Sequence, residues 1–342
     1  MDRPESKLPA LLLRWFDRAK RDLPWRRTKD PYAIWISEVM LQQTQVATVI
    51  PYFERFLERF PTLQSLAETP QADVLSLWSG LGYYSRARNL HRAAQVVTQV
   101  HAGVLPACVD QLLELPGFGR YTAGAVASIA FGIQAPLVDG NVSRVLTRLF
   151  AVDDEKREKR VWELASSLVP RGRPGDFNQS LMELGATVCV PVAPLCLLCP
   201  VRSHCQALAQ GRVDQLPPPK VRAARKPLNL AVAVCRKGAR LLLMRRDDGG
   251  LFGGLWELPS ADAQTLPSLL GTHGALRARL GTVTRTLTHR DLTLELWDAK
   301  AGAALKVPKG YQGLKWVTAA QVPALGISAA TRAVLKKIAF LA

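Results

Sequence analysis

Four cysteines, Cys189, Cys196, Cys199 and Cys205, stand close together, with gaps of six, two and five residues. Zinc sites usually form from two close pairs, whereas here only Cys196 and Cys199 make such a pair. Four thiolates along one compact loop suit a [4Fe-4S] cluster better, and structural zinc remains the alternative. Since all four occupy ligand positions, we expect the cluster to hold a loop rather than to activate water.

Two carboxylates have neighbours that favour opposite protonation states. Glu38 lies in an apolar segment, residues 31–46, expected to be one helix, where desolvation would raise its pKa. Asp139 precedes a helical run, whose amides and dipole would keep it ionised. Such a pair can cleave a glycosidic bond, because the acid protonates the leaving group while the carboxylate stabilises a sugar cation. Taken singly, a solvated surface glutamate and a plain N-cap aspartate explain them equally well.

A glycine-containing turn, residues 115–123, joins two apolar-periodic segments. Gly117 and Gly119 allow the backbone to turn tightly and to approach another surface. Amides at the start of the next helix could then face a phosphate. Read alone, the segment is equally consistent with an ordinary turn between helices.

The elements that must position these groups change character along the chain. Residues 8 to about 210 show mainly helical spacing, cut by Pro and Gly into helices of ordinary length. Residues 216–227 are Pro-rich and basic, which predicts an extended linker. Short apolar runs at 230–235, 241–244 and 292–297 then predict strands, and 329–340 a final helix. We expect a mainly α domain over 1–212, a linker over 213–228 and an α+β domain over 229–342, without internal repeats.

The overall composition indicates a polyanionic partner. The 342 residues exceed what one hydrophobic core usually serves, and 45 Lys and Arg against 28 Asp and Glu leave a net charge of +17. DNA is the natural partner, while a cationic membrane-surface protein is disfavoured because no basic amphipathic helix stands out. The N-terminus lacks the pattern of a signal peptide, so a reducing cytoplasm is expected.

Taken together, these motifs resemble the MutY-type adenine glycosylases of the helix-hairpin-helix (endonuclease III) superfamily. The resemblance rests on residues 37–44, 115–123, 138–142 and the cysteine loop. It implies that Glu38 is the general acid at adenine N7, that Asp139 stabilises or captures the sugar cation, and that Asn141 helps to hold this site. The hairpin is expected to grip DNA through amides and a monovalent cation. Superfamily members that also cut the backbone use a lysine where this chain has Tyr121, so a monofunctional glycosylase is implied.

The same resemblance assigns further residues to substrate recognition. Arg26 and Glu183 would lie around the extruded adenine, although a surface ion pair is the alternative. Gln42, on the helix face of Glu38, and Gln43, about a quarter-turn onward, would reach into the opened duplex. Arg202 on the cysteine loop is expected to contact phosphates.

Two more segments are expected to open the duplex and read the opposite base. Leu81 and Tyr83 would form the wedge of a base-flipping enzyme. The C-terminal domain resembles the Nudix-like domain that recognises 8-oxoguanine, through Leu287, Thr288 and His289. The family usually has an aromatic where this chain has Leu287. Residues 260–282 contain a single acidic residue, Asp262, so Nudix pyrophosphatase activity is not expected.

The expected activity is therefore excision of adenine paired with 8-oxoguanine or guanine in base excision repair, by a monomer acting on double-stranded DNA in the cytoplasm, at the nucleoid. A pyrimidine-lesion glycosylase with lyase activity is one alternative, and Tyr121 together with the glutamine pair opposes it. A non-catalytic iron–sulfur DNA-binding protein is another, and the presence of both Glu38 and Asp139 opposes that one.

Overall fold

A computed structural model describes residues 7–219, 224–303 and 305–341 of the chain. Contacts divide it into two units, the first containing residues 1–67 and 92–221 and the second containing 68–91 and 222–342. Residues 68–91 thus group with the C-terminal part of the chain. The expected division, with one domain over 1–212 and the next over 229–342, placed them in the first domain. Residues 220–223 of the predicted linker lie outside the described residues.

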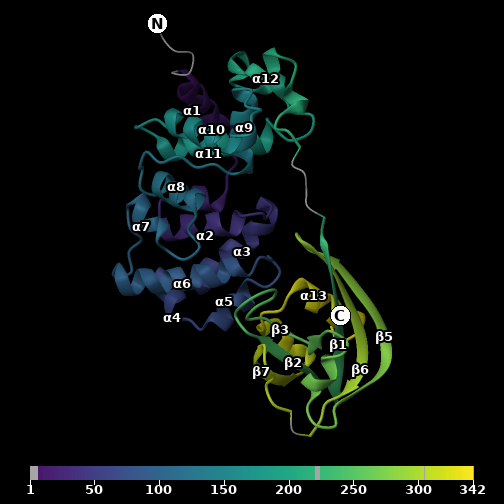
Figure 1. The fold of residues 1–342 in the computed structure, drawn as a ribbon. Coiled ribbons are helices and arrows are strands. Elements are labelled where there is room, and N and C mark those ends of the chain that lie inside the picture. Colours follow the sequence, from purple (N-terminus) through teal and green to yellow (C-terminus); the bar gives the residue numbers. More distant parts are fainter. Residues whose placement is uncertain (1–6, 220–223, 304, 342) are drawn as a thin grey trace. The chain divides into compact units, whose positions relative to one another are not determined.

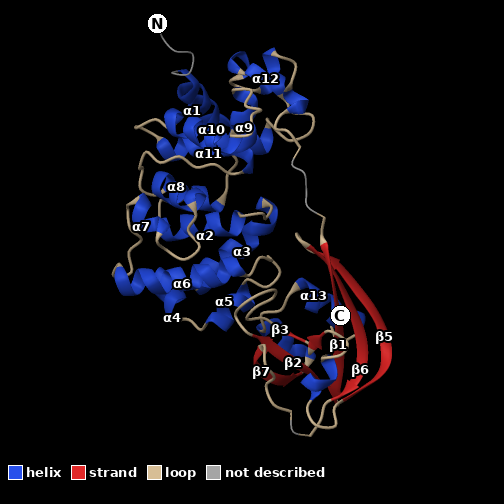
Figure 2. Cartoon of the chain, in the orientation of Figure 1, coloured by secondary structure: helices blue, strands red, loops and turns tan. Residues whose placement is uncertain are grey.

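The first unit is helical, as predicted, and strands begin only at residue 226 among the described residues (Figures 1 and 2). Short 3-10 turns at Pro24–Arg26, Cys196–Leu198, Arg202–His204 and Val213–Gln215 connect the helices. In chain order the helices of this unit are α1 (Leu8–Ala19), α2 (Pro31–Leu41), α3 (Val46–Arg59), α4 (Leu63–Glu68, ending at the boundary), α7 (Val109–Leu113), α8 (Arg120–Ile129), α9 (Gly140–Leu149), α10 (Arg157–Leu168), α11 (Pro174–Thr187) and α12 (Gln206–Ala209).

Helix α2 is the central helix for the chemistry, because all its residues from Tyr32 to Met40 are buried. The side chain of Asp30 caps it by accepting from the amides of Tyr32 and Ala33, and Pro31 occupies the first turn. A helix that is apolar all round is buried all round. Glu38 is the single acidic residue of α2, and it is buried with the rest of this helix.

Helices α9 and α11 approach each other closely beside the second carboxylate. A Cβ added to Gly185 of α11 would lie 2.6 Å from Cβ of Asn141 on α9. Only glycine allows this approach, and it lets the backbone of α11 lie against the first turn of α9. Side chains of α1, α8, α9, α10 and α11 form one hydrophobic core of this unit.

The second unit contains a seven-stranded sheet in the order β3-β2-β1-β6-β5, with β4 pairing β1 and β7 pairing β2. Strands β1 and β6 are parallel, and the other pairs are antiparallel. The elements are α5 (Gln71–Leu77), β1 (Lys226–Lys237), β2 (Arg240–Arg246), β3 (Trp256–Glu257), β4 (Ser260–Ala261), β5 (Ala275–Thr286), β6 (Arg290–Lys300), β7 (Tyr311–Val317) and α13 (Ala329–Lys337), and α6 (Ser85–Val100) begins here and continues into the first unit.

Both faces of this sheet are covered. Val232 and Val234 of β1 belong to the core that includes α13, whereas Ala231, Ala233 and Cys235 belong to the opposite core, with the 3-10 helix Leu266–Leu270. The alternation follows the two-residue period of a strand. The α+β prediction is confirmed, and β1 begins at Lys226, inside the segment predicted to be a linker.

Candidate active site

Glu38 is a buried acid poised to be neutral. Glu38 is 4 % exposed, and the hydroxyl of Tyr121 on α8 donates a hydrogen bond to its Oε2. Burial raises the pKa of Glu38 to about 7; the Tyr121 hydrogen bond and the Arg26 charge oppose the rise, and the Asp139 charge adds to it. Both carboxylates also act on Tyr121, so the three groups share one region.

Asp139 is the N-cap of α9, as its sequence position predicted. Oδ1 accepts from the Val142 amide at 2.7 Å, and Oδ2 accepts from the Asn141 side chain at 2.9 Å. Contrary to expectation, the pKa of Asp139 is raised, because burial outweighs these hydrogen bonds and the nearby Arg144 charge. The cap hydrogen bonds therefore limit the rise instead of producing a depressed pKa.

A hydrogen-bond chain continues from Asp139 to the cysteine loop. Arg144 donates to Oδ1 of Asn141 at 2.9 Å, to the Gly185 carbonyl at 2.7 Å and to the Cys189 carbonyl at 2.7 Å. The orientation of Asn141, and through it of Asp139, is thus tied to the first cysteine. Arg144 was missed in the sequence, although its place three residues after Asn141 on one helix could have indicated it.

Glu183 is the centre of a buried ion-pair network. Its side chain is 0 % exposed, Arg21 binds it in bidentate fashion at 2.7 and 2.9 Å, and Arg26 donates at 2.8 Å. Burial alone would raise the pKa of Glu183, but the hydrogen bonds from Arg21 and Arg26 lower it to about 2. A surface ion pair is thus the wrong interpretation. Sequence reasoning missed Arg21, which lies five residues before Arg26.

The end of α2 differs from the single helix predicted over residues 31–46. The helix ends at Leu41, and Gln43 has a φ of 56°, a left-handed backbone that breaks the helix before α3 begins at Val46. Gln42 is the C-cap, and its amide donates to the Thr122 hydroxyl of α8 at 3.2 Å. The helical-face argument for both glutamines is therefore wrong, since neither lies within α2.

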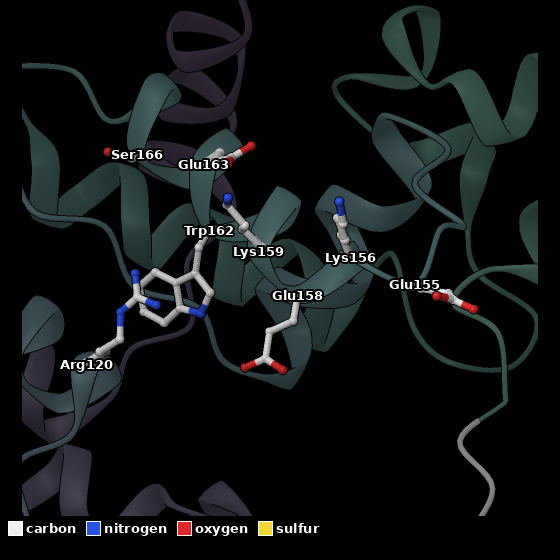
Figure 3. Close-up of a pocket in the computed structure, with 8 residues that line it drawn as sticks. All are labelled: Arg120, Glu155, Lys156, Glu158, Lys159, Trp162, Glu163 and Ser166. Carbon is white, nitrogen blue, oxygen red and sulfur yellow. The ribbon is translucent and has the colours of Figure 1, made fainter.

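The glycine turn forms a hairpin between α7 and α8. Gly117 has a φ of 80°, Gly119 is the N-cap of α8, and the Phe118 ring packs 5.3 Å from that of Trp35 on α2. Next to Gly119, the Arg120 guanidinium stacks on Trp162 of α10 at 4.1 Å, at the edge of an open hollow of about 700 Å³ (Figure 3). Neither Glu38 nor Asp139 lines this hollow, whose lining carries both cations and carboxylates, including Lys159 and Glu158.

The four cysteines face one cavity. They line it together with Arg148, which donates to the carbonyls of Val190, Pro191 and Leu216 and whose Nη1 lies 3.5 Å from Sγ of Cys189. Among the described residues, no three His, Cys, Asp or Glu side chains are placed to hold one metal ion. Arg202 is exposed on the same loop.

In the second unit, the turn formed by residues 80–83 presents Tyr83, which is 42 % exposed, whereas Leu81 is 7 % exposed. The Tyr83 hydroxyl hydrogen-bonds the Thr288 hydroxyl at 2.8 Å. Both residues line a cavity of about 520 Å³. Leu287, His289 and Phe252 also line it, and Phe252 is an aromatic that the sequence reasoning did not assign to this region.

Within the described part of the chain, no helix has the length and apolarity needed to cross a bilayer.

Comparison with known proteins relates this geometry to two families. Residues 36–171 match the model described as HhH-GPD superfamily base excision DNA repair protein, and residues 231–337 match a NUDIX domain model. The chain is 38 % identical to the adenine DNA glycosylase of Homo sapiens, over 95 % of this chain and 72 % of that protein. It is also 38 % identical to the enzyme of Rattus norvegicus, over 95 % and 76 %. A solved thermostable thymine-DNA glycosylase is similar, with a TM-score of 0.56 and 33 % identity over 60 % of this chain and 97 % of that chain.

Proposed function

The chain belongs to the adenine DNA glycosylase family, a group of DNA N-glycosylases of base excision repair, and we propose that it excises adenine paired with 8-oxoguanine or guanine. The observation that carries this proposal is the pairing of a buried, neutral-poised Glu38 with an N-capping Asp139 around Tyr121.

In this mechanism Glu38 protonates adenine N7 and so makes the base a better leaving group. A pKa of about 7 keeps much of this carboxyl protonated at neutral pH. Asp139 stabilises or transiently captures the sugar cation before water attacks. Asn141 fixes the direction of the Asp139 oxygens.

Tyr121 supports a monofunctional reaction. Its hydroxyl is committed to Glu38, and a phenol cannot form the Schiff base that backbone cleavage by a lysine requires. The product is thus an intact strand with an abasic site.

Substrate selection uses groups in both units. Arg26 and Glu183 border the extruded adenine, and the Arg21 ion pair keeps Glu183 ionised there. Thr288 and His289 read 8-oxoguanine beside Leu287, with Tyr83 already hydrogen-bonded to Thr288. Gln42, Gln43, Leu81 and Tyr83 hold the opened duplex.

DNA binding relies on charge and on backbone amides. The net charge of +17 suits a polyanion, and the hairpin at Gly117 and Gly119 presents the start of α8 to a phosphate, where a monovalent cation completes the contact.

The cysteine cavity suits a [4Fe-4S] cluster held by Cys189, Cys196, Cys199 and Cys205. Bound there, the cluster supplies a rigid crosslink of the loop.

The test is a glycosylase assay on duplexes containing 8-oxoguanine·adenine, guanine·adenine and, as a control, guanine·thymine. We expect free adenine and alkali-labile sites from the first two duplexes, without spontaneous strand cleavage. Glu38→Gln and Asp139→Asn should each remove nearly all activity while retaining DNA binding. Full activity in Glu38→Gln would refute the acid assignment, and preference for guanine·thymine would refute the substrate.

A further inference from the structure

The turn that presents Tyr83 has a strained backbone. Gly80 and Gly82 have φ values of 108° and 74°, and Tyr83 itself has a φ of 48°. A left-handed conformation is natural for glycine but unfavourable for a tyrosine, so surrounding contacts must hold it.

Arg86, in the first turn of α6, makes the contacts that can hold this turn. Its guanidinium lies 5.3 Å from the centre of the Tyr83 ring and 5.4 Å from that of Trp78. Nη2 donates to the Gly82 carbonyl at 3.3 Å and approaches the Leu81 carbonyl at 3.5 Å. The Trp78 indole donates to the same Gly82 carbonyl at 3.1 Å.

The environment of Arg86 indicates that these contacts are fixed. The residue is 9 % exposed, and burial lowers its pKa to about 10, which leaves it charged at neutral pH. A buried guanidinium beside two aromatic rings gains from cation–π attraction while its N–H groups bind carbonyls. At the far end of Tyr83, the hydroxyl is held by Thr288.

We propose that Arg86 is a positioning residue for base opening, which clamps the turn of residues 80–83 and presents the Tyr83 ring to DNA in its strained conformation. The proposal rests on the proposed wedge role of this turn. Arg86 itself contacts neither the base that leaves nor the reacting sugar. Arg86 holds Tyr83 in its bound conformation in the free protein, so that the binding of DNA does not carry the entropic cost of ordering this side chain.

The decisive variant is Arg86→Lys, which keeps the charge but loses the planar group that spans rings and carbonyls. Arg236→Lys is the matched control, because Arg236 also contacts an aromatic ring, Phe340 at 5.9 Å, and donates to a carbonyl, that of Ile338 at 2.7 Å. The full chain is used throughout.

Hydrogen exchange of the free protein gives the first readout. In Arg86→Lys we expect about tenfold faster exchange confined to residues 79–86, and no local change in Arg236→Lys. Unchanged exchange in 79–86 overturns the proposal, and so does an increase spread evenly over the second unit, which would show a merely structural role.

Base opening gives the second readout, through the fluorescence of 2-aminopurine placed opposite 8-oxoguanine. We expect slower opening and a single-turnover rate about tenfold lower in Arg86→Lys, and wild-type behaviour in Arg236→Lys. If opening is normal in Arg86→Lys but slow in Tyr83→Ala, the wedge stands and the Arg86 proposal fails. If Tyr83→Ala opens DNA normally, the wedge role of Tyr83 fails, and the exchange data alone decide whether Arg86 clamps the turn.

Discussion

At the scale of single residues, the proposed chemistry depends on how one hydrogen bond, from Tyr121, affects the pKa of one carboxyl group, that of Glu38. Burial raises the pKa of Glu38, and the hydrogen bond that Tyr121 donates opposes this rise, so that the pKa of Glu38 is about 7. The ionised form of Glu38 accepts this hydrogen bond best, so the tyrosine limits how much of the acid is protonated.

Removing that hydroxyl should move the pH dependence of excision. In the proposed mechanism Glu38 must be protonated to act, so single-turnover rates should fall as pH rises through its pKa of about 7. In Tyr121→Phe the pKa of Glu38 rises, and the fall should begin at higher pH. A pH–rate profile from pH 5 to 9 measures both midpoints, and an unchanged or lower midpoint in Tyr121→Phe would contradict the assignment.

The ionised form of Glu38 lowers the stability of the folded protein. Its pKa in the folded protein, about 7, lies above the ordinary value of 4.5, so the folded state binds the proton more tightly than the unfolded state does. The free energy of unfolding therefore falls as pH rises from about 4.5 through 7. Glu38→Gln, which cannot ionise, should therefore be more stable than the native protein by ~2–3 kcal/mol at pH 8 and should show little gain near pH 4. Denaturant unfolding at the two pH values tests this, and an equal gain at both would disprove the linkage.

At the scale of elements, the candidate site depends on a close approach of α11 to α9, where a Cβ added to Gly185 would lie 2.6 Å from Cβ of Asn141. Gly185 faces Asn141, which aligns Asp139. The atoms nearest to a methyl group at Gly185 would be Cβ, Cα and the carbonyl oxygen of Asn141. These atoms cannot move aside as the end of a flexible side chain could.

Gly185→Ala should thus separate the helices and misalign Asp139. We expect a loss of ~1–3 kcal/mol in the free energy of unfolding and a larger loss in the excision rate than in DNA affinity. Gly172→Ala is the control, since nothing lies within 4 Å of a Cβ added there. Equal effects of the two substitutions would show that the close approach is unimportant.

At the scale of the whole molecule, the net positive charge contributes to the affinity for DNA. A net charge of +17 implies that much of the affinity for DNA comes from counterion release and is independent of sequence. In the proposed function, discrimination between mispairs would then come from the residues assigned above to the adenine and to 8-oxoguanine.

Binding of the Glu38→Gln protein to duplexes at 50 to 200 mM salt measures this component. If six to ten phosphates are neutralised, the affinity for matched DNA should fall by about 10³ to 10⁵ over this range. The ratio of affinities for 8-oxoguanine·adenine and matched duplexes should change far less. A salt-insensitive affinity would contradict the assigned role of the charge.

The sequence by itself determined the types of the elements and the division into a helical and an α+β part, because periodicity is a local property. Motif spacing and resemblance indicated Glu38, Asp139 and the four cysteines as candidates for the site. Tertiary structure decided the environments. It buried Glu183 against Arg21, 162 residues away, raised the pKa of Asp139 where a cap alone predicts a lower one, and ended α2 before Gln42. It also grouped residues 68–91 with the C-terminal unit. Burial and long-range pairing depend on distances in space, and no local pattern encodes them.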